Sequence, residues 1–199
     1  MVTNVLLTGV GGQGIITAST ILSQACRIAG WEVKKSEVHG MSQRGGSVNS
    51  YVRFSPEERI ASPLFPEGGA DVLMAFEPLE GLRQLKQAAE DAVVMVEELR
   101  IVPVTVNLAG LSYPADVLDR LLATDRDVRI LKASEKAVEL GEPRAANTIM
   151  LGALSTLLGL PEDAWREAME LVLKPGAVDV NLRAFEAGKG LAEAQSVEA

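Results

Sequence analysis

The chain has 199 residues, of which 47% are hydrophobic and 23% are charged. A chain of this length and composition folds as one globular domain, and we expect that domain to span residues 1–190 and to leave residues 191–199 as a frayed tail. The formal net charge of −8 argues against nucleic acids and anionic membrane surfaces as partners.

The predicted elements alternate between buried strands and amphipathic helices along most of the chain. The first strand covers residues 5–8, stops at a glycine-rich turn, and is followed by a helix over residues 13–29. Further strands are predicted at 31–38, 48–54, 71–76, 92–96, 104–106 and 127–131, and further helices at 78–89, 114–123, 135–140, from 161 onward and at 181–188. This order predicts an α/β fold: a doubly wound, mostly parallel sheet with helices on both faces, as in a Rossmann-like three-layer domain.

One segment, residues 145–161, contains no charged side chain. A helix in this segment is apolar nearly all round and has to be covered on more than one side. Its 17 residues are marginal for a bilayer, and polar residues interrupt them, so we expect no membrane span. A central helix or a subunit interface fits the pattern better.

Cysteine and histidine each occur once, as Cys26 and His39. A lone cysteine cannot form a disulfide within the chain, and together with the lack of a signal-peptide pattern it favours a cytoplasmic location. A zinc site or an iron–sulfur cluster needs about four Cys or His ligands. We therefore expect no metal site in this chain and expect any redox metal to be carried by another one.

The turn after the first strand has the pattern G-x-G-x-x-G. Free N–H groups at the start of the following helix can hold a phosphate, a pyrophosphate or a carboxylate. Glu37 lies roughly where a dinucleotide-binding enzyme places its ribose-binding acid, so nicotinamide or flavin binding is one interpretation, and tight packing of the strand against the helix is the other. The candidate binding residues are Gly9, Gly11, Gly12, Gln13, Gly14 and Glu37.

The loop after the second strand concentrates the only histidine, an arginine and three glycines within residues 36–46. His39 can move protons near neutral pH and Arg44 can bind a carboxylate or a phosphate, which makes both catalytic candidates. Packing is the alternative for both: His39 then hydrogen-bonds backbone, and Arg44 pairs with Glu37 or Glu77. A partner subunit can equally use these groups. The binding candidates of this loop are Ser42, Gln43, Arg44, Gly45 and Gly46.

Residues 141–147 open the uncharged segment. Arg144 and Asn147 are interface candidates, but a structural role is favoured, because Asn147 can bond backbone and Arg144 can form a surface ion pair. The sequence also lacks a Gly-x-Ser-x-Gly elbow and a nucleoside-triphosphate loop, which argues against a hydrolase or a kinase.

With these motifs the sequence resembles the γ-type domain of the 2-oxoacid:ferredoxin oxidoreductases, in particular the small (beta) subunits of the indolepyruvate group. The most specific match is Ser-Glu-Val-His-Gly-Met-Ser-Gln-Arg-Gly-Gly-Ser-Val at residues 36–48. The similarity covers nearly the whole chain and also includes residues 9–15, 62–63, 70–73, 76–80, 143–147 and 181–186.

The resemblance implies an assembly that oxidatively decarboxylates arylpyruvates such as indolepyruvate, forms the acyl-CoA thioester and passes electrons to ferredoxin. Thiamine diphosphate and 4Fe-4S clusters are then expected on the large (alpha) subunit. The present chain is expected to be the accessory subunit, inactive alone and without a cofactor of its own. CoA is then a shared substrate, and the isolated chain can form a homodimer.

Two other functions fit parts of the sequence. One is a self-sufficient NAD- or FAD-binding Rossmann oxidoreductase, supported by the glycine-rich turn and Glu37. The other is a purely structural assembly subunit whose loops only pack against its partner.

Overall fold

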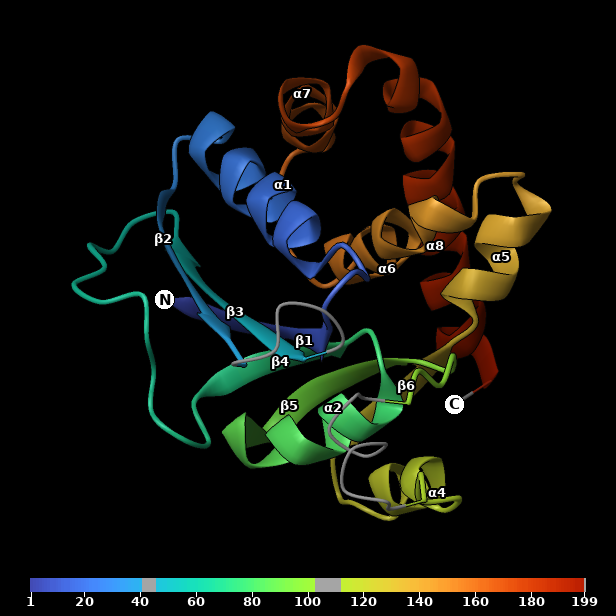
Figure 1. The fold of residues 1–199 in the computed structure, drawn as a ribbon. Coiled ribbons are helices and arrows are strands. Elements are labelled where there is room, and N and C mark those ends of the chain that lie inside the picture. The colour runs from blue at the N-terminus through green and yellow to red at the C-terminus, as the bar shows by residue number, and fades with distance from the viewer. Residues whose placement is uncertain (41–45, 103–111, 199) are drawn as a thin grey trace.

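The computed structural model describes residues 1–40, 46–102 and 112–198, and six strands in them form one sheet (Figure 1). The strand order is β2-β3-β1-β4-β5-β6. The neighbours β1/β4, β4/β5 and β5/β6 are parallel, whereas β3 is antiparallel to both β1 and β2. The strands are β1 (Thr3–Val10), β2 (Glu32–His39), β3 (Ser47–Ser55), β4 (Ala70–Ala75), β5 (Ala88–Glu97) and β6 (Asp127–Leu131).

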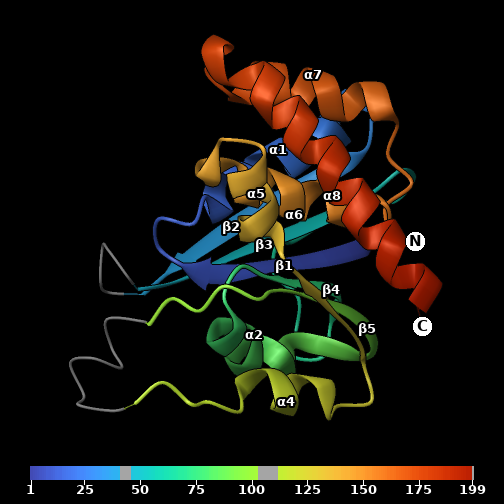
Figure 2. The ribbon, with the colours of Figure 1, turned by 90° about the vertical axis from the view of Figure 1, so that its right-hand side faces the viewer.

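Helices cover both faces of this sheet (Figure 2). One face carries α1 (Ile15–Ile28), α5 (Ala133–Glu139), α6 (Ala146–Ser155), α7 (Glu162–Val172) and α8 (Val178–Glu198). The other face carries α2 (Pro78–Gln84) and α4 (Val117–Leu122), and three short 3-10 turns join elements: η1 (Leu85–Gln87), η2 (Pro143–Ala145) and η3 (Pro175–Ala177). The predicted α/β fold, with a mostly parallel sheet between two helical layers, is confirmed.

The antiparallel strand β3 is the main departure from a regular doubly wound sheet. Only residues 40–46 separate the end of β2 from the start of β3, and strands joined without a long crossover pair antiparallel. β3 therefore lies between β1 and β2 and separates them. β2 still runs in the same direction as β1, because two antiparallel steps restore it.

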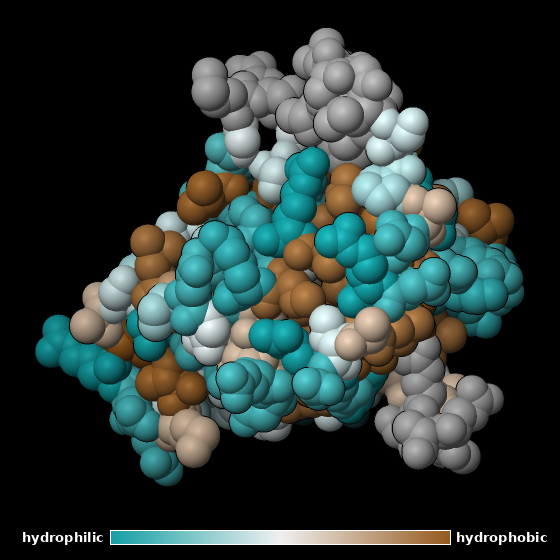
Figure 3. Space-filling model, turned by 90° about the horizontal axis from the view of Figure 1, so that it is seen from below, coloured by the Kyte–Doolittle hydropathy of each residue, from teal (hydrophilic) through white to brown (hydrophobic). Residues whose placement is uncertain are grey.

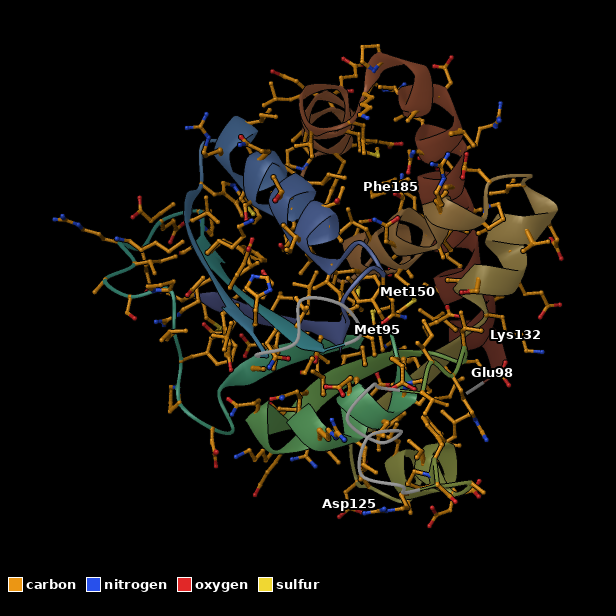
Figure 4. The ribbon with its side chains drawn as sticks, viewed as in Figure 1. Met95, Glu98, Asp125, Lys132, Met150 and Phe185 are labelled. Carbon is orange, nitrogen blue, oxygen red and sulfur yellow. The ribbon has the colours of Figure 1, made fainter. Side chains whose placement is uncertain are left out.

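Helix α6 is the centre of the larger layer. Every residue from Asn147 to Ser155 is buried, so the uncharged segment is covered on several sides, as predicted. Met150 faces the sheet near Met95 of β5 (Figure 4). The ring centroid of Phe185 in α8 lies 5.3 Å from that of Trp165 in α7. Close packing of α8 on α6 depends on Gly152 and Gly188, where a Cβ would lie closer than 3.0 Å to the other helix's backbone.

Several element boundaries differ from the predicted ones. β5 begins at Ala88 instead of residue 92, and α2 is shorter than predicted because η1 replaces its last turn. α8 runs to Glu198, well past residue 188. That residues 191–199 fray stays a prediction, and the strand predicted at 104–106 falls outside the described residues.

The outer surface over α2 and α4 is mostly hydrophilic with smaller hydrophobic areas (Figure 3). Within the part of the chain that the structure describes, no helix combines the length and apolar character needed to cross a bilayer. A different surface lies at the edge of the sheet where strands end, namely β1, β2, β4, β5 and β6. It gathers the glycine-rich turn and several buried acidic groups, and open α/β sheets bind ligands at such an edge.

Candidate functional site

The glycine-rich turn joins β1 to α1, as the sequence predicted. Gly12 and Gly14 have φ angles of 109° and 79°, in a region that residues with a side chain rarely adopt. The amides of residues 15–17 open the first turn of α1 and have no carbonyl within the helix to bond. The Gly11 N–H is already used, since it donates to the Gly46 carbonyl at 2.9 Å.

The side chain of Gln13 links the ends of two neighbouring strands. Its Oε1 accepts the Val10 N–H at 2.7 Å, and its Nε2 donates to the Phe76 carbonyl. A Cβ on Gly9 would lie 2.7 Å from Gln13 Oε1, so the absence of a side chain at Gly9 makes room for this amide. Gln13 therefore fixes the turn against β4.

A chain of buried polar side chains connects the turn to α6 and α8. Asn147 Nδ2 donates to the Gly14 carbonyl at 3.3 Å, and Thr148 Oγ1 donates to Asn181 Oδ1 at 2.6 Å. Asn181 Nδ2 in turn donates to the Ala177 carbonyl at 2.8 Å. Asn147 thus has the structural role that the sequence favoured for it.

A pocket of about 440 Å³ opens beside this polar chain, and we call it the α6 pocket. Its apolar wall includes Phe76, Leu99, Ile101, Met150 and Leu173. The polar and charged residues on its lining are Gln13, Thr17, Glu97, Ser134, Arg144, Asn147 and Asn181. Arg144 is 89% exposed at this rim and forms an ion pair with Glu142 at 2.9 Å, as expected of a surface arginine.

Glu97 is the one carboxylate in that lining. It stands at the end of β5, is only 4% exposed, and accepts the N–H groups of Ala133 at 2.8 Å, Ser134 at 3.2 Å and Leu99 at 3.2 Å. Burial raises the pKa of Glu97, while these hydrogen bonds oppose that shift. Glu97 therefore holds the start of α5 onto β5, and its charge makes the α6 pocket unfavourable for an anion.

Glu77 stands just after β4, at the N-cap of α2, and has a similar role. It is fully buried, and it accepts the Glu80 N–H at 3.0 Å and the Tyr113 hydroxyl at 2.6 Å. Burial raises the pKa of Glu77, and burial together with the Glu77 hydrogen bond raises the pKa of Tyr113. Glu77 thus caps α2 and binds the segment that leads into α4.

No motif pointed to Glu97, and Glu77 was expected only as a possible ion-pair partner of Arg44. Glu97 is the last residue of the apolar strand β5, and Glu77 follows two residues after the apolar strand β4, at the end where parallel strands place ligands and helix starts. That position in the pattern is the signal that could have found them.

The end of β2 lies on the other side of the turn. A pocket of about 430 Å³, which we call the His39 pocket, is lined by Gly11, Gly12, Gly14, Ile15, Ile16, His39 and Val48. His39 Nε2 lies 3.4 Å from Glu37 Oε2, and Glu37 Oε1 lies 2.8 Å from Lys35 Nζ. The hydrogen bond from Lys35 lowers the pKa of Glu37.

The structure brings some of the predicted site residues together and separates others. The structure brings His39 beside Gly11, Gly12 and Gly14, and it brings Arg144 and Asn147 beside Gly12, Gln13 and Gly14. Glu37 lines neither pocket, and its carboxylate lies against Lys35 and His39 instead. Gly46 is buried and bonded to Gly11, whereas Ser42, Gln43, Arg44 and Gly45 fall outside the described residues.

Residues 4–191 match the family model described as pyruvate ferredoxin/flavodoxin oxidoreductase. The chain belongs to this pyruvate ferredoxin/flavodoxin oxidoreductase family. Among curated members, the indolepyruvate oxidoreductase subunit IorB of Thermococcus kodakarensis is 40% identical over 190 residues, which are 93% of each chain. The subunit of the same name from Archaeoglobus fulgidus is 38% identical over 195 residues, 93% of this chain and 92% of the relative.

Solved structures of the family have the same fold. The gamma subunit of keto/oxoacid ferredoxin oxidoreductase from Geobacter sulfurreducens matches with a TM-score of 0.73 and 23% identity, over 96% of this chain and 99% of its own. The 2-oxoglutarate:ferredoxin oxidoreductase of Magnetococcus marinus matches with a TM-score of 0.76 and 23% identity. This family member covers 97% of the present chain, which spans 31% of the larger one.

Proposed function

We propose that the chain is the accessory subunit of a 2-oxoacid:ferredoxin oxidoreductase that acts on indolepyruvate or related arylpyruvates in the cytoplasm. The assembly decarboxylates the oxoacid oxidatively, forms the acyl-CoA thioester and transfers the electrons to ferredoxin. The observation that carries this proposal is the 40% identity, over 93% of both chains, to a subunit named for indolepyruvate.

The chemistry of this chain's side chains supports a large partner subunit that carries the cofactors. Its one cysteine, Cys26, is buried, and burial raises the pKa of its thiol to about 12. The described residues contain no group of three or more Cys, His, Asp or Glu side chains with the arrangement of a metal site. These residues do not fit a 4Fe-4S cluster, and the sequence lacks the Gly-Asp-Gly thiamine motif. We therefore assign both cofactors to the partner.

The edge that carries the glycine-rich turn is the best candidate for the surface that faces the partner. Ile16 and Val38 on one side of the turn, and Leu99 and Val102 on the other, are large apolar residues that are all more than 40% exposed. Apolar side chains gathered around a ligand-binding edge favour a protein contact there. In the complex this edge would cover the partner's active site.

An anionic group of the oxoacid or of CoA, which we treat as a shared substrate, needs positive charge at this edge. The free amides at the start of α1 supply part of it, on the side of the His39 pocket. The α6 pocket is less suitable, because Glu97 lies in its wall. We assign the remaining charge to Arg44, and we assign proton exchange to His39, which lines the His39 pocket.

The dinucleotide alternative has less support from this geometry. In a Rossmann domain the acidic residue of the second strand stands beside the glycine-rich turn, but β3 separates β2 from β1 here. Calorimetric titration of the isolated chain with NADH or FAD tests this alternative. Saturable tight binding to the isolated chain would favour this alternative.

The test is reconstitution of the purified chain with the large subunit. We expect ferredoxin reduction that depends on indolepyruvate, on CoA and on both chains, with iron and thiamine found on the large subunit. Full activity of the large subunit alone would contradict the proposed role.

A pair of arginine variants separates catalysis from scaffolding. Arg44→Ala should raise the KM for CoA or the oxoacid, or lower kcat, in the assembled complex. Arg144→Ala is the matched control, because Arg144 is exposed and pairs with Glu142. If loop variants abolish assembly but leave the assembled complex fully active, the chain is a structural subunit.

A further inference from the structure

Strand β2 forms an open edge of the sheet (Figure 1). Among the described strands it pairs only with β3, over eight consecutive residues without a shift in register. It contains no proline and no glycine. Proteins usually shorten, bulge or cover such an edge, because its unpaired N–H and C=O groups can pair with another strand.

The strand at the opposite edge of the sheet, β6, is shorter and is covered by a helix. β6 has five residues, and α8 contacts it. β2 is longer and more regular, so its protection has to come from its side chains or from a partner strand.

The charges of β2 are placed on one face of the sheet. Lys35 and Glu37 are 24% and 26% exposed, and Lys35 Nζ lies 2.8 Å from Glu37 Oε1. Lys35 Nζ also donates to Thr20 Oγ1 of α1 at 2.9 Å, which places both side chains on the α1 side. Lys34 and Val38 point to the other side of the sheet, because successive side chains alternate.

We propose that β2 pairs antiparallel with β2 of a second copy of this chain, with Ser36 opposite Ser36. In this register Lys35 lies opposite Glu37 of the second copy, and Glu37 lies opposite its Lys35. The interface is isologous, so the Lys35–Glu37 pair occurs twice, once on each side of the symmetry axis. The two sheets then form one continuous sheet, with both α1 helices on the same side.

The charge pattern selects this register over its neighbours. A shift that centres the pairing on Lys35 places two lysines opposite each other, and a shift that centres it on Glu37 places two glutamates opposite each other. Opposite charges across a strand pair stabilise it, and like charges destabilise it. The same side chains that discourage pairing in other registers are therefore complementary in this one.

The test measures the mass of the full-length chain in solution across a concentration series. We expect a dimer for the unmodified chain and at least tenfold weaker association for Lys35→Glu and for Glu37→Lys, since each places like charges opposite one another. Lys34→Glu changes the net charge as Lys35→Glu does but lies opposite Val38, so it should stay dimeric. A wild-type chain that is monomeric throughout, or single variants that dimerise normally, would overturn the proposal.

Mixing the two weakened variants distinguishes lost pairing from lost folding. Lys35→Glu presents two negative residues on this face and Glu37→Lys presents two positive ones, so an equal mixture should form a heterodimer. The absence of a heterodimer from two folded variants would contradict the proposed register.

Crosslinking tests the register directly. Ser36→Cys should form a disulfide between copies, because directly opposite residues have Cα atoms about 4.5–5.5 Å apart. Lys34→Cys is the control, since its two copies would lie about 13 Å apart along the strands. The native Cys26 is buried and does not compete. Equal crosslinking of both variants would rule the register out.

Discussion

The side-chain amide of Asn147 donates a 3.3 Å hydrogen bond to the carbonyl of Gly14, 133 positions earlier in the chain, and it occupies the space where a Cβ on Gly14 would lie. Gly14 also has a φ of 79°, which a side chain would strain. Gly14 thus meets two requirements: it allows the positive φ of the turn into α1, and it leaves room for Asn147 of α6. Mutations can separate the effects of these two requirements.

Gly14→Ala should lower the free energy of unfolding by about 2 kcal/mol or more, because positive-φ strain and the clash with Asn147 add. Gly12→Ala is the matched control: its φ is 109° but nothing lies within 4 Å of the added Cβ, so it should cost only the strain, about 1–2 kcal/mol. Urea denaturation measures both. In the Gly14→Ala background, Asn147→Ala should recover part of the loss, and a strictly additive double mutant would show that the clash is relieved elsewhere.

Gln13 gives a second prediction, because the sequence offered it as a binding residue and the structure uses its amide between β1 and β4. Gln13→Ala removes two hydrogen bonds and leaves the Val10 N–H and the Phe76 carbonyl without this partner, so we expect a loss of about 1–3 kcal/mol in stability. Once assembled, the variant complex should keep its KM for CoA. Unchanged stability with a raised KM would assign Gln13 to ligand binding instead.

The features that the sequence predicted are those that local patterns determine. Glycines at positions 9, 11, 12 and 14 indicate a strand, a turn and a helix because the backbone itself requires them. The uncharged segment indicates a covered helix because charge cannot be buried without a partner. Fold class and the position of the turn follow from such local requirements.

The features that it missed depend on residues far apart in the chain. Strand β3 enters between β1 and β2 through pairing over the whole sheet, and this separates Glu37 from the turn. Glu97 meets the amides of Ala133 and Ser134 only after β5 and β6 align. In both cases the neighbouring residues indicate where a strand ends, but not which distant residues it meets.

Glu97 gives a pH prediction. Its folded-state pKa is raised above the ordinary value of 4.5, so the native chain takes up a proton before the unfolded chain does as the pH falls. Between the raised pKa and 4.5, lowering the pH therefore stabilises the native state through this group. Glu97→Gln removes this titration and turns an N–H₂ group toward backbone N–H donors.

We expect Glu97→Gln to be less stable than the wild type at pH 7 by about 1–3 kcal/mol. The difference should widen as the pH falls toward 4.5, because only the wild type gains stability there. Urea denaturation at a series of pH values measures it. A difference that shrinks on acidification would mean that the pKa of Glu97 is lowered by its hydrogen bonds.

The packing of α8 on α6 gives the last prediction. A Cβ on Gly188 would fall closer than 3.0 Å to the Ile149 carbonyl, which is backbone and cannot rotate away, so Gly188→Ala should separate the helices and cost about 3 kcal/mol or more. Gly190, in the same helix, has open space at its Cβ, and Gly190→Ala should instead stabilise the chain by about 0.5–1 kcal/mol through helix propensity. Thermal and urea unfolding of the two variants measure the contrast. If both substitutions stabilised the chain, α8 would not pack on α6 at the observed distance.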